Sequence, residues 1–453
     1  MTRRPNRQPN RQSNRQPGRP ASPPQALVDA FEVTIVRIGA DGDGIAAMPD
    51  GTSLYVPATL PGERVLARPT IRRGEGWASD IVSVVDPSAD RVPAACQHFG
   101  TCGGCTLQHW RAEPYQAWKT GLLAAALRRA GYADPTIAPM QCGKDGQRRR
   151  LDLAARRGQG GLRLGLHAAR SADIVALSEC PITDPSLVRL LAPLRTMLNG
   201  LQTVRREASV VLNLLDAGPD LLLRSDADLP LGDRLALTDF ARIHDLPRIS
   251  WARGNDTPEP VCVLRPPSTS MAGIEVLPPP GAFLQASRDG ERAIVACVLD
   301  AIQPLARGRI GELYAGCGTV TFALAGIAPV VAWEGDAAAM GALRAAANRA
   351  GLAGRVTVTQ RDLTRQPLTQ KELSGFAALV MDPPFAGAGP QMASIAAAKI
   401  PVVVYISCNP AVLAREAGLL AAAGYRLDVA TPVDQFLWSS RLESVCVFRL
   451  GAG

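Results

Sequence analysis

Glu312-Leu-Tyr-Ala-Gly316-Cys-Gly318-Thr319 is the stretch of sequence that decides the fold of the C-terminal part. It follows a strand-like apolar run and precedes an apolar helix, so its glycines form a tight turn that a nucleoside ligand can approach closely. About twenty residues later Glu334 ends the next predicted strand, where a carboxylate can accept both ribose hydroxyls. One pair of glycines with a carboxylate at this interval indicates S-adenosylmethionine rather than a dinucleotide.

The sequence around this turn alternates between helices and apolar strands. We expect helices over about 288–306 and 337–349, and strands that end at Tyr314 or cover 330–333, 377–381 and 402–406. Repeated units of this kind predict a parallel, doubly wound α/β sheet over 276–453, with its ligand beyond the carboxyl ends of the strands.

The preceding sequence divides into three further segments. Residues 1–27 contain six arginines and few large apolar side chains, which predicts a disordered basic tail. Residues 28–87 show short β-branched alternations between Gly, Asp and Pro turns, typical of a small OB-like β-barrel that binds RNA. Residues 88–275 give a mixed pattern, with a helix near 115–130, and predict a central α+β domain.

The overall charge gives weak evidence for a nucleic-acid partner. The formal net charge is +8, but the tail contributes six of these charges and leaves only about +2 on the rest. No apolar run is long enough to span a membrane and no signal peptide is evident. We therefore expect a cytoplasmic, monomeric protein without a membrane partner.

Cysteine spacing indicates a metal centre. Cys96-x5-Cys102-Gly-Gly-Cys105 places three thiols within ten residues, and Cys180 can supply a fourth ligand. This pattern fits a thiolate-bound metal or Fe–S cluster, because the glycines let the backbone fold tightly around a centre. It is not the spacing of a radical S-adenosylmethionine enzyme.

Two other interpretations of the cysteines remain open. Zinc could be bound by two of the thiols together with His98 or His109, and unligated buried cysteines are also compatible with the pattern.

Between 144 and 157 the net charge is +4, which predicts either an RNA contact or a solvated strand face.

Three further motifs occur at the predicted sheet edge. Asp382-Pro-Pro-Phe385 and Cys408-Asn-Pro410 each follow a strand, and Glu443 begins the terminal strand. Because Pro410 is suited to open a helix, we expect the helix N-terminus to lower the pKa of the Cys408 thiol. A free cysteine that is merely buried and a Glu that is merely exposed are the plain alternatives.

Cys408 and Glu443 together match the chemistry of pyrimidine C5 methylation. A thiolate that adds to C6 makes C5 nucleophilic toward a sulfonium methyl group, and a base then removes the C5 proton so that the thiol can leave. The base must first be flipped out of any stack.

With these motifs the chain resembles the Fe–S-containing RNA 5-methyluridine methyltransferases that act on large-subunit ribosomal RNA. The resemblance rests on Ser407-Cys408-Asn-Pro410 and Leu442-Glu443-Ser444, with Gly42-Asp-Gly-Ile-Ala and Leu60-Pro-Gly-Glu in the N-terminal barrel. It implies a TRAM domain over 28–87 and a class I, Rossmann-like methyltransferase domain over 276–453. Catalysis would use Cys408 as nucleophile and Glu443 as base on a flipped-out uridine in 23S ribosomal RNA, and the protein would be cytoplasmic.

The resemblance also implies two ligand sets. A [4Fe–4S] cluster would be bound by Cys96, Cys102, Cys105 and Cys180. S-adenosylmethionine would contact Gln285, Tyr314, Thr319, Glu334, Asp362 and Asp382.

Three positions depart from the family pattern. Tyr314 and Thr319 replace the usual Phe and Asn, and Phe385 stands where the family has Arg. The family also often has Phe-x-x-x-x-His near Arg441. Because Asp-Pro-Pro-Phe is the motif of exocyclic-amine methyltransferases, that activity is one alternative, and a non-catalytic RNA-binding assembly factor is another.

Overall fold

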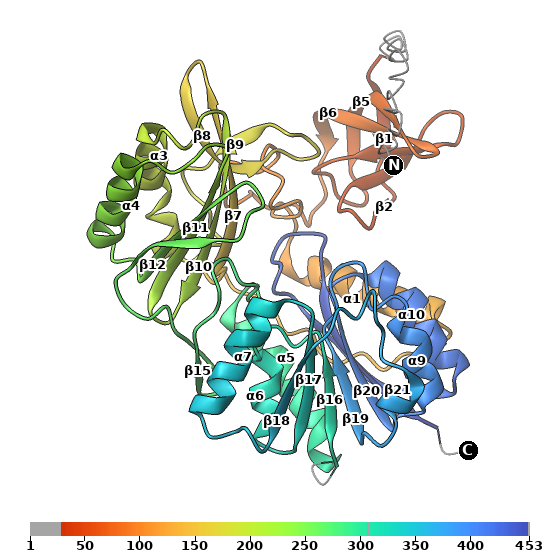
Figure 1. The fold of residues 1–453 in the computed structure, drawn as a ribbon. Coiled ribbons are helices and arrows are strands. Elements are labelled where there is room, and N and C mark those ends of the chain that lie inside the picture. The colour runs from red at the N-terminus through yellow and green to blue at the C-terminus, as the bar shows by residue number, and fades with distance from the viewer. Residues whose placement is uncertain (1–28, 306–307, 452–453) are drawn as a thin grey trace, which may run out of the picture.

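The computed structural model describes residues 29–305 and 308–451, which form three parts, each built around its own sheet (Figure 1). The predicted basic tail lies outside the described residues. No helix among the described residues has a stretch long and apolar enough to cross a bilayer.

The N-terminal part is a small curled sheet of six strands. They are β1 (Phe31–Thr34), β2 (Arg37–Ile38), β3 (Gly44–Ala47), β4 (Ser53–Val56), β5 (Arg64–Arg73) and β6 (Gly76–Asp86). Their spatial order is β1-β5-β6-β4-β3-β2, and the N–H of Val36, between β1 and β2, donates to the carbonyl of Ile45 in β3 at 2.8 Å. Alternating side chains such as Leu54 and Val65 fill the interior, as the period-2 pattern predicts.

The central part is a seven-stranded sheet with helices on one face (Figure 1). Its strands are β7 (Arg150–Gly158), β8 (Gly161–His167), β9 (Ile174–Ala176), β10 (Glu207–Leu215), β11 (Gly218–Ser225), β12 (Arg248–Arg253) and β13 (Glu259–Val263). Its helices are α2 (Pro185–Val188), α3 (Leu191–Gly200) and α4 (Leu231–Ile243). A short hairpin of β14 (Thr269–Met271) and β15 (Ile274–Val276) leads into the C-terminal part.

The C-terminal part is a doubly wound sheet in the order β18-β17-β16-β19-β20-β22-β21. The strands are β16 (Ile310–Leu313), β17 (Val330–Glu334), β18 (Val356–Gln360), β19 (Ala378–Met381), β20 (Val402–Ser407), β21 (Tyr425–Val433) and β22 (Glu443–Leu450). The helices are α5 (Arg288–Ile302), followed by a short 3₁₀ turn η1 (Gln303–Leu305), then α6 (Thr319–Ala325), α7 (Ala337–Arg349), α8 (Gln370–Leu373), α9 (Gln391–Ala398) and α10 (Pro410–Ala422). The predicted helices and strands of this part are confirmed to within a few residues.

The order of this sheet determines where a ligand can bind. β16 to β20 run parallel, and β22 is antiparallel to both β20 and β21. The chain winds from β16 toward β18 and then crosses back to β19. In sheets of this type the ligand lies beyond the carboxyl ends of the strands, at the point where the winding direction changes.

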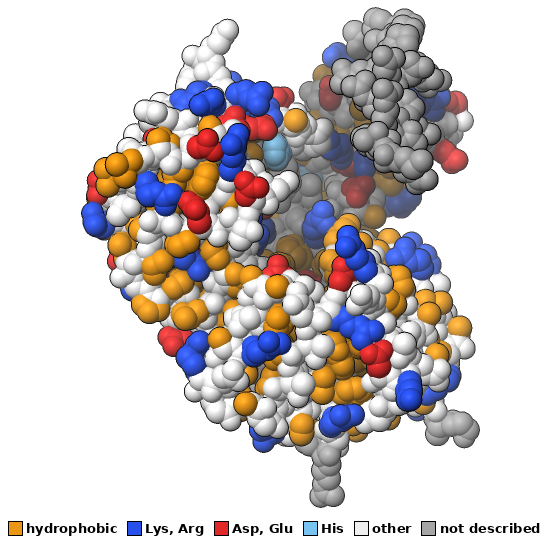
Figure 2. All heavy atoms as spheres, in the orientation of Figure 1, with side chains coloured by type: hydrophobic (Ala, Val, Ile, Leu, Met, Phe, Trp, Pro, Cys, Tyr) orange, Lys and Arg blue, Asp and Glu red, His pale blue; other side chains and the backbone are white. Residues whose placement is uncertain are grey.

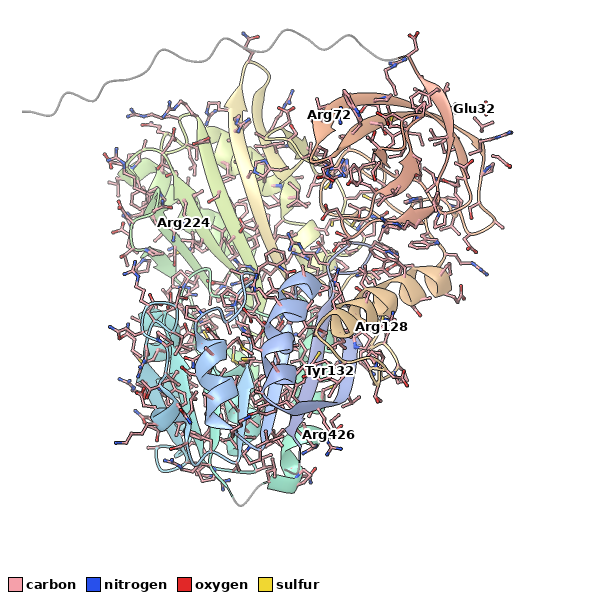
Figure 3. All side chains as sticks on the ribbon, turned by 90° about the vertical axis from the view of Figure 1, so that its right-hand side faces the viewer. Glu32, Arg72, Arg128, Tyr132, Arg224 and Arg426 are labelled. Carbon is pink, nitrogen blue, oxygen red and sulfur yellow. The ribbon has the colours of Figure 1, made fainter. Side chains whose placement is uncertain are left out.

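Helix α1 (Ala112–Arg129) precedes the central sheet in sequence but packs on the C-terminal sheet. Leu123 and Leu127 share a buried apolar cluster with Leu420 of α10. The ring of Tyr132, just beyond α1, lies 5.5 Å from that of Phe448 (Figure 3). The C-terminal core is therefore completed by a segment about 300 residues away in the chain.

Candidate active site

The glycine turn after β16 forms the centre of the site. Tyr314 has a φ of +63° and Gly318 a φ of +104°, and a Cβ on Gly318 would lie 2.5 Å from Leu343. Only glycine fits Gly318, because both its backbone angle and the space beside it exclude a side chain. The N–H of Gly316 donates to Glu334 Oε2 at 2.8 Å, so the carboxylate is held against the turn.

The structure places the predicted S-adenosylmethionine residues along one edge of the sheet. Each of the following comes at, or directly after, the carboxyl end of a parallel strand: Tyr314 (β16), Glu334 (β17), Asp362 (β18) and Asp382 (β19). Thr319 opens α6 beyond the turn, and Gln285 reaches Asp382 from the segment before α5 through a 2.9 Å hydrogen bond. This brings the six predicted residues to the edge where parallel sheets bind ligands.

Cys408, one residue beyond the end of β20, lies near Glu443 at the start of β22. Ser407 pairs with Ser444 in the antiparallel ladder of β20 and β22, so the next pair outward is Cys408 with Glu443. Asn409 caps α10 by accepting from the N–H groups of Ala411 and Val412, which confirms the helix start predicted at Pro410. The motifs of Cys408 and Glu443, which are 35 residues apart in the chain, thus meet where β20 ends and β22 begins.

The pKa of the Cys408 thiol differs from the prediction. Burial, followed by the negative charges of Glu443 and Asp382, raises it to about 12. The expected lowering by the helix N-terminus is therefore wrong, because desolvation and two nearby carboxylates outweigh the helix end. In the free protein this thiol carries its proton at neutral pH.

The two carboxyl groups beside Cys408 are themselves perturbed. Burial raises the pKa of Asp382 to about 7, although the hydrogen bond from Gln285 acts in the opposite direction. Burial, with the charge of Asp382, raises the pKa of Glu443 well above its ordinary value. Glu443 Oε1 is buried and has no hydrogen-bond partner among the described residues. A buried carboxylate with one oxygen unpaired is suited to accept a proton from a ligand.

Two residues of the site have no assigned role in the sequence motifs. Glu312 lies inside β16, and burial raises its pKa to about 8. Gln435 follows β21 and donates to Glu443 Oε2 at 2.8 Å. A charged residue in an otherwise apolar strand could have signalled Glu312, whereas nothing in the local sequence marks Gln435.

Phe385, which replaces an expected Arg, lies beside a cation from another motif. Phe385 is 51% exposed, and the Arg441 guanidinium lies 4.4 Å from the centroid of its ring. The Phe385 carbonyl accepts from Asn409 Nδ2 at 3.1 Å, which holds the ring close to the Cys408 loop. The positive charge at this position is thus supplied by Arg441, and an aromatic face is added.

The four predicted cluster ligands lie together. Cys96, Cys102, Cys105 and Cys180 line one small cavity between the 96–105 segment and the central sheet. Burial, together with smaller effects of the neighbouring thiols, raises the pKa of Cys105 to about 12. Within residues 29–305 and 308–451, no three Cys, His, Asp or Glu side chains lie close enough to hold a single metal ion.

The two histidines proposed for a zinc site are placed differently. His98 lines the cysteine cavity, and its Nε2 accepts from the backbone N–H of Ser178 at 3.1 Å. His109 does not line the cysteine cavity, and its ring lies 5.2 Å from that of Phe99.

Much of the basic stretch at 144–157 is structural. Arg149 pairs with Glu291, and Arg150 and Arg157 donate to backbone carbonyls. Lys144 and Arg156 are exposed. On the face shown in Figure 2, Lys and Arg side chains are scattered over all three parts rather than gathered in one patch. An RNA contact by this stretch as a whole is therefore not supported.

Comparisons with known proteins agree with this site. No protein-family model matches the chain. An RNA methyltransferase of Caulobacter vibrioides is 39% identical, over 92% of this chain and 99% of the relative. The 23S rRNA (uracil(1939)-C(5))-methyltransferase RlmD of Yersinia enterocolitica is 33% identical, over 93% and 95%.

A solved structure shares the fold. The tRNA (uracil-54, C5)-methyltransferase of Pyrococcus abyssi, in complex with S-adenosyl-L-homocysteine, superposes with a TM-score of 0.69 at 19% identity, and the match covers 92% of this chain and all of that one. The fold and the extent of the sequence identity show that the chain belongs to the RNA methyltransferase family that includes RlmD.

Proposed function

We propose that this RNA methyltransferase transfers a methyl group from S-adenosylmethionine to C5 of a uridine in ribosomal RNA, through a covalent adduct with Cys408. The observation that carries the proposal is the pairing of β20 with β22, which sets Cys408 opposite Glu443. The relative RlmD is a uracil-C5 methyltransferase of 23S rRNA, which supports the same chemistry. An exocyclic-amine methyltransferase needs neither a thiol nor a second base.

The methyl donor would lie along the edge formed by the β16 to β19 strand ends. Glu334 would accept from the ribose hydroxyls, and Gln285 with Asp382 would line the side nearest Cys408. Bound there, S-adenosylmethionine supplies an electrophilic methyl group. Phe385 and Arg441 present an exposed ring and a cation to the RNA at the entrance.

The residues of this chain would then act in sequence. The Cys408 thiol releases its proton to solvent and its sulfur bonds to C6, which moves the C5–C6 π electron pair to C5. After C5 gains the methyl group, Glu443 Oε1 takes the C5 proton, the C5–C6 double bond reforms and the C6–S bond breaks. The net products are the methylated uridine, the demethylated donor and one proton.

We also propose that the cysteine cavity holds an Fe–S cluster. Four thiols that line one cavity form the donor set of such a cluster, and a cation among them would offset their mutual repulsion. A four-iron cluster binds each cysteine at a different iron, so its ligands stand farther apart than those around one ion. No catalytic step depends on this cluster, which would tie the 96–105 segment to the central sheet near Cys180.

The experiment that tests the activity is identification of the product. Ribosomal RNA without this modification is incubated with the protein and S-adenosylmethionine, digested to nucleosides and analysed by mass spectrometry. We expect 5-methyluridine. Methylated adenine or cytosine amines would instead establish the exocyclic-amine activity of the Asp382-Pro-Pro-Phe385 motif.

A further inference from the structure

Four side chains form a continuous buried hydrogen-bond chain across the site. Asp382 Oδ2 accepts from Gln285 Nε2 at 2.9 Å, Gln285 Oε1 accepts from Gln435 Nε2 at 2.8 Å, and Gln435 Nε2 also donates to Glu443 Oε2 at 2.8 Å. Gln285, Gln435 and Glu443 are only 5%, 6% and 4% exposed. The chain therefore links the carboxylate at the donor side to the carboxylate opposite Cys408.

One backbone group fixes the direction of this chain. The N–H of Ala286 donates to Gln435 Oε1 at 2.9 Å, which identifies that atom as the amide oxygen. The two hydrogens on Gln435 Nε2 must then go to Gln285 Oε1 and Glu443 Oε2. This in turn points the Gln285 amide nitrogen at Asp382, so each carboxylate receives one N–H donor.

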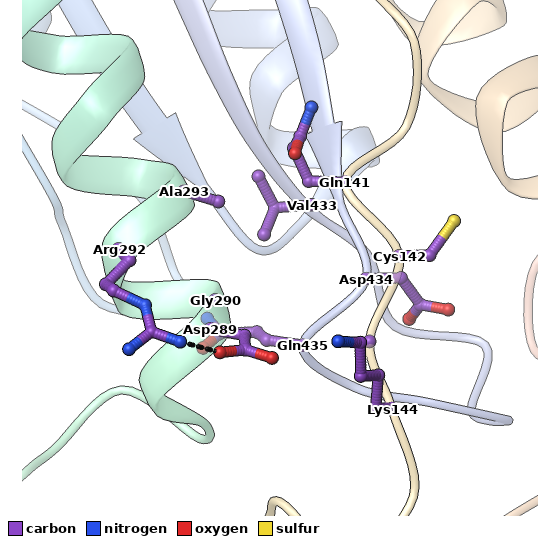
Figure 4. Close-up of a pocket in the computed structure, with 11 residues that line it drawn as sticks. Gln141, Cys142, Lys144, Asp289, Gly290, Arg292, Ala293, Val433, Asp434 and Gln435 are labelled. Atoms are coloured by element: carbon purple, nitrogen blue, oxygen red, sulfur yellow. Dashed lines mark hydrogen bonds and ion pairs between the residues drawn. The ribbon is translucent and has the colours of Figure 1, made fainter.

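Packing holds the Gln435 side chain in this position. A Cβ on Gly290, in the first turn of α5, would lie 2.7 Å from Gln435 Cβ, so the helix backbone presses directly on this residue. Gln435 also lines a cavity of about 380 Å³ together with Lys144, Asp289 and Arg292 (Figure 4). Glu443 does not line this cavity, so Gln435 separates the carboxylate from it.

We infer that Gln435 is a positioning residue for Glu443, holding the carboxylate by Oε2 so that the unpaired Oε1 is presented to the C5 proton. The inference rests on the proposed function. Gln435 would act on the last step only, in which Glu443 Oε1 takes the proton, the C5–C6 double bond reforms and the Cys408 sulfur leaves C6. Formation of the adduct does not require this carboxylate to be aligned.

The test is a Gln435→Met variant, which keeps the length of the side chain but has no donor or acceptor. We expect the adduct to form as in wild type but to persist on ordinary uridine RNA, and product release to slow by about 10²-fold, the effect of a small misplacement of a catalytic group. Denaturing gels and intact mass spectrometry measure the adduct over time. Loss of three buried hydrogen bonds should lower the melting temperature, so persistence of the adduct, and not stability, is the deciding measurement.

Gln391→Met is the matched control. Gln391 is also a buried glutamine of the C-terminal part, but both of its hydrogen bonds go to the backbone of Leu368. Gln391→Met should also lower the melting temperature, but no adduct should persist. Equal adduct persistence in both variants would show a general packing effect and overturn the inference.

A second variant keeps the inference testable if Gln435→Met does not fold. Gln435→Glu retains an acceptor for the N–H of Ala286. When ionised, the new carboxylate repels Glu443 and displaces it. Since this charge is lost as the pH falls, we expect persistence of the adduct to decrease at lower pH. Wild-type turnover of either Gln435 variant, with no persistent adduct, overturns the inference. Failure of wild type itself to form any adduct or 5-methyluridine instead refutes the proposed function.

Discussion

Ser407 and Ser444 pair across β20 and β22, and the Oγ of Ser444 donates to the Ser407 carbonyl at 3.1 Å. This register sets the end of β20 against the start of β22. A shift of one residue would send Glu443 to the other face of the sheet, away from Cys408. The proposed base is therefore held by strand pairing, and the proposed nucleophile directly follows the paired end of β20.

Replacing the proposed base should trap the reaction. In Glu443→Gln, Gln435 can still donate to the remaining oxygen, but the amide cannot take the C5 proton. We expect turnover to fall about 10²–10⁴-fold and a methylated Cys408 adduct to accumulate on ordinary uridine RNA. The Cys408→Ala/Glu443→Gln double variant is the control and should form no adduct. Normal turnover by Glu443→Gln would exclude this residue as the base.

The reactivity of Cys408 should depend on pH as a buried thiol does. Since its pKa is raised to about 12, the thiolate fraction in the free protein rises about tenfold with each pH unit below that value. Alkylation by iodoacetamide, followed at the Cys408 peptide by mass spectrometry, should rise accordingly. Above the pKa of Asp382, the Asp382→Asn variant should react faster, because it lacks one of the repelling charges. A rate that levels off near neutral pH would contradict this electrostatic account.

The cysteine cavity should hold iron and sulfide. Anaerobically purified protein should contain iron and inorganic sulfide in equal amounts, and Cys105→Ser should lose both. Cys142→Ser is the matched control, because Cys142 is exposed and does not line the cavity. Zinc without sulfide in wild type, or full iron content in Cys105→Ser, would contradict the cluster.

The contact between α1 and the segment after β21 should be important for stability. Lys119 Nζ lies 2.5 Å from Asp434 Oδ1, and both side chains are almost fully buried. Lys119→Met leaves the Asp434 charge buried without its cation, which should cost about 3–5 kcal/mol in the free energy of unfolding. Arg128→Met, on the exposed side of α1, should change it by less than about 0.5 kcal/mol. Urea unfolding curves measure both, and equal stability of the two variants would refute this role.

Much of the C-terminal sheet is predictable from local sequence, because the alternation of apolar strands and helices is a short-range pattern. Cys408 and Glu443 are predictable from their motifs, and their facing positions follow once β20 and β22 pair. Contacts between distant segments are not encoded locally. The docking of α1 on α10 and the stacking of Arg441 on Phe385 join residues far apart in the chain.

The electrostatics of the site also depend on the folded structure. The prediction for Cys408 used the helix N-terminus, which the sequence shows, but not the desolvation and the two carboxylates that fold next to the thiol. Gln435 has no local signal, because the N–H that orients its amide belongs to Ala286, which is 149 positions earlier in the chain.

The central claim is that Cys408 bonds to C6 of a uridine during methyl transfer. Ribosomal RNA containing 5-fluorouridine is incubated with the protein and S-adenosylmethionine, and the complex is examined by mass spectrometry under denaturing conditions. Because fluorine at C5 cannot be removed as a proton, we predict a stable methylated adduct on the Cys408 peptide of wild type and none in Cys408→Ala. Absence of an adduct in wild type, together with methylation of ordinary RNA by Cys408→Ala, would contradict the account.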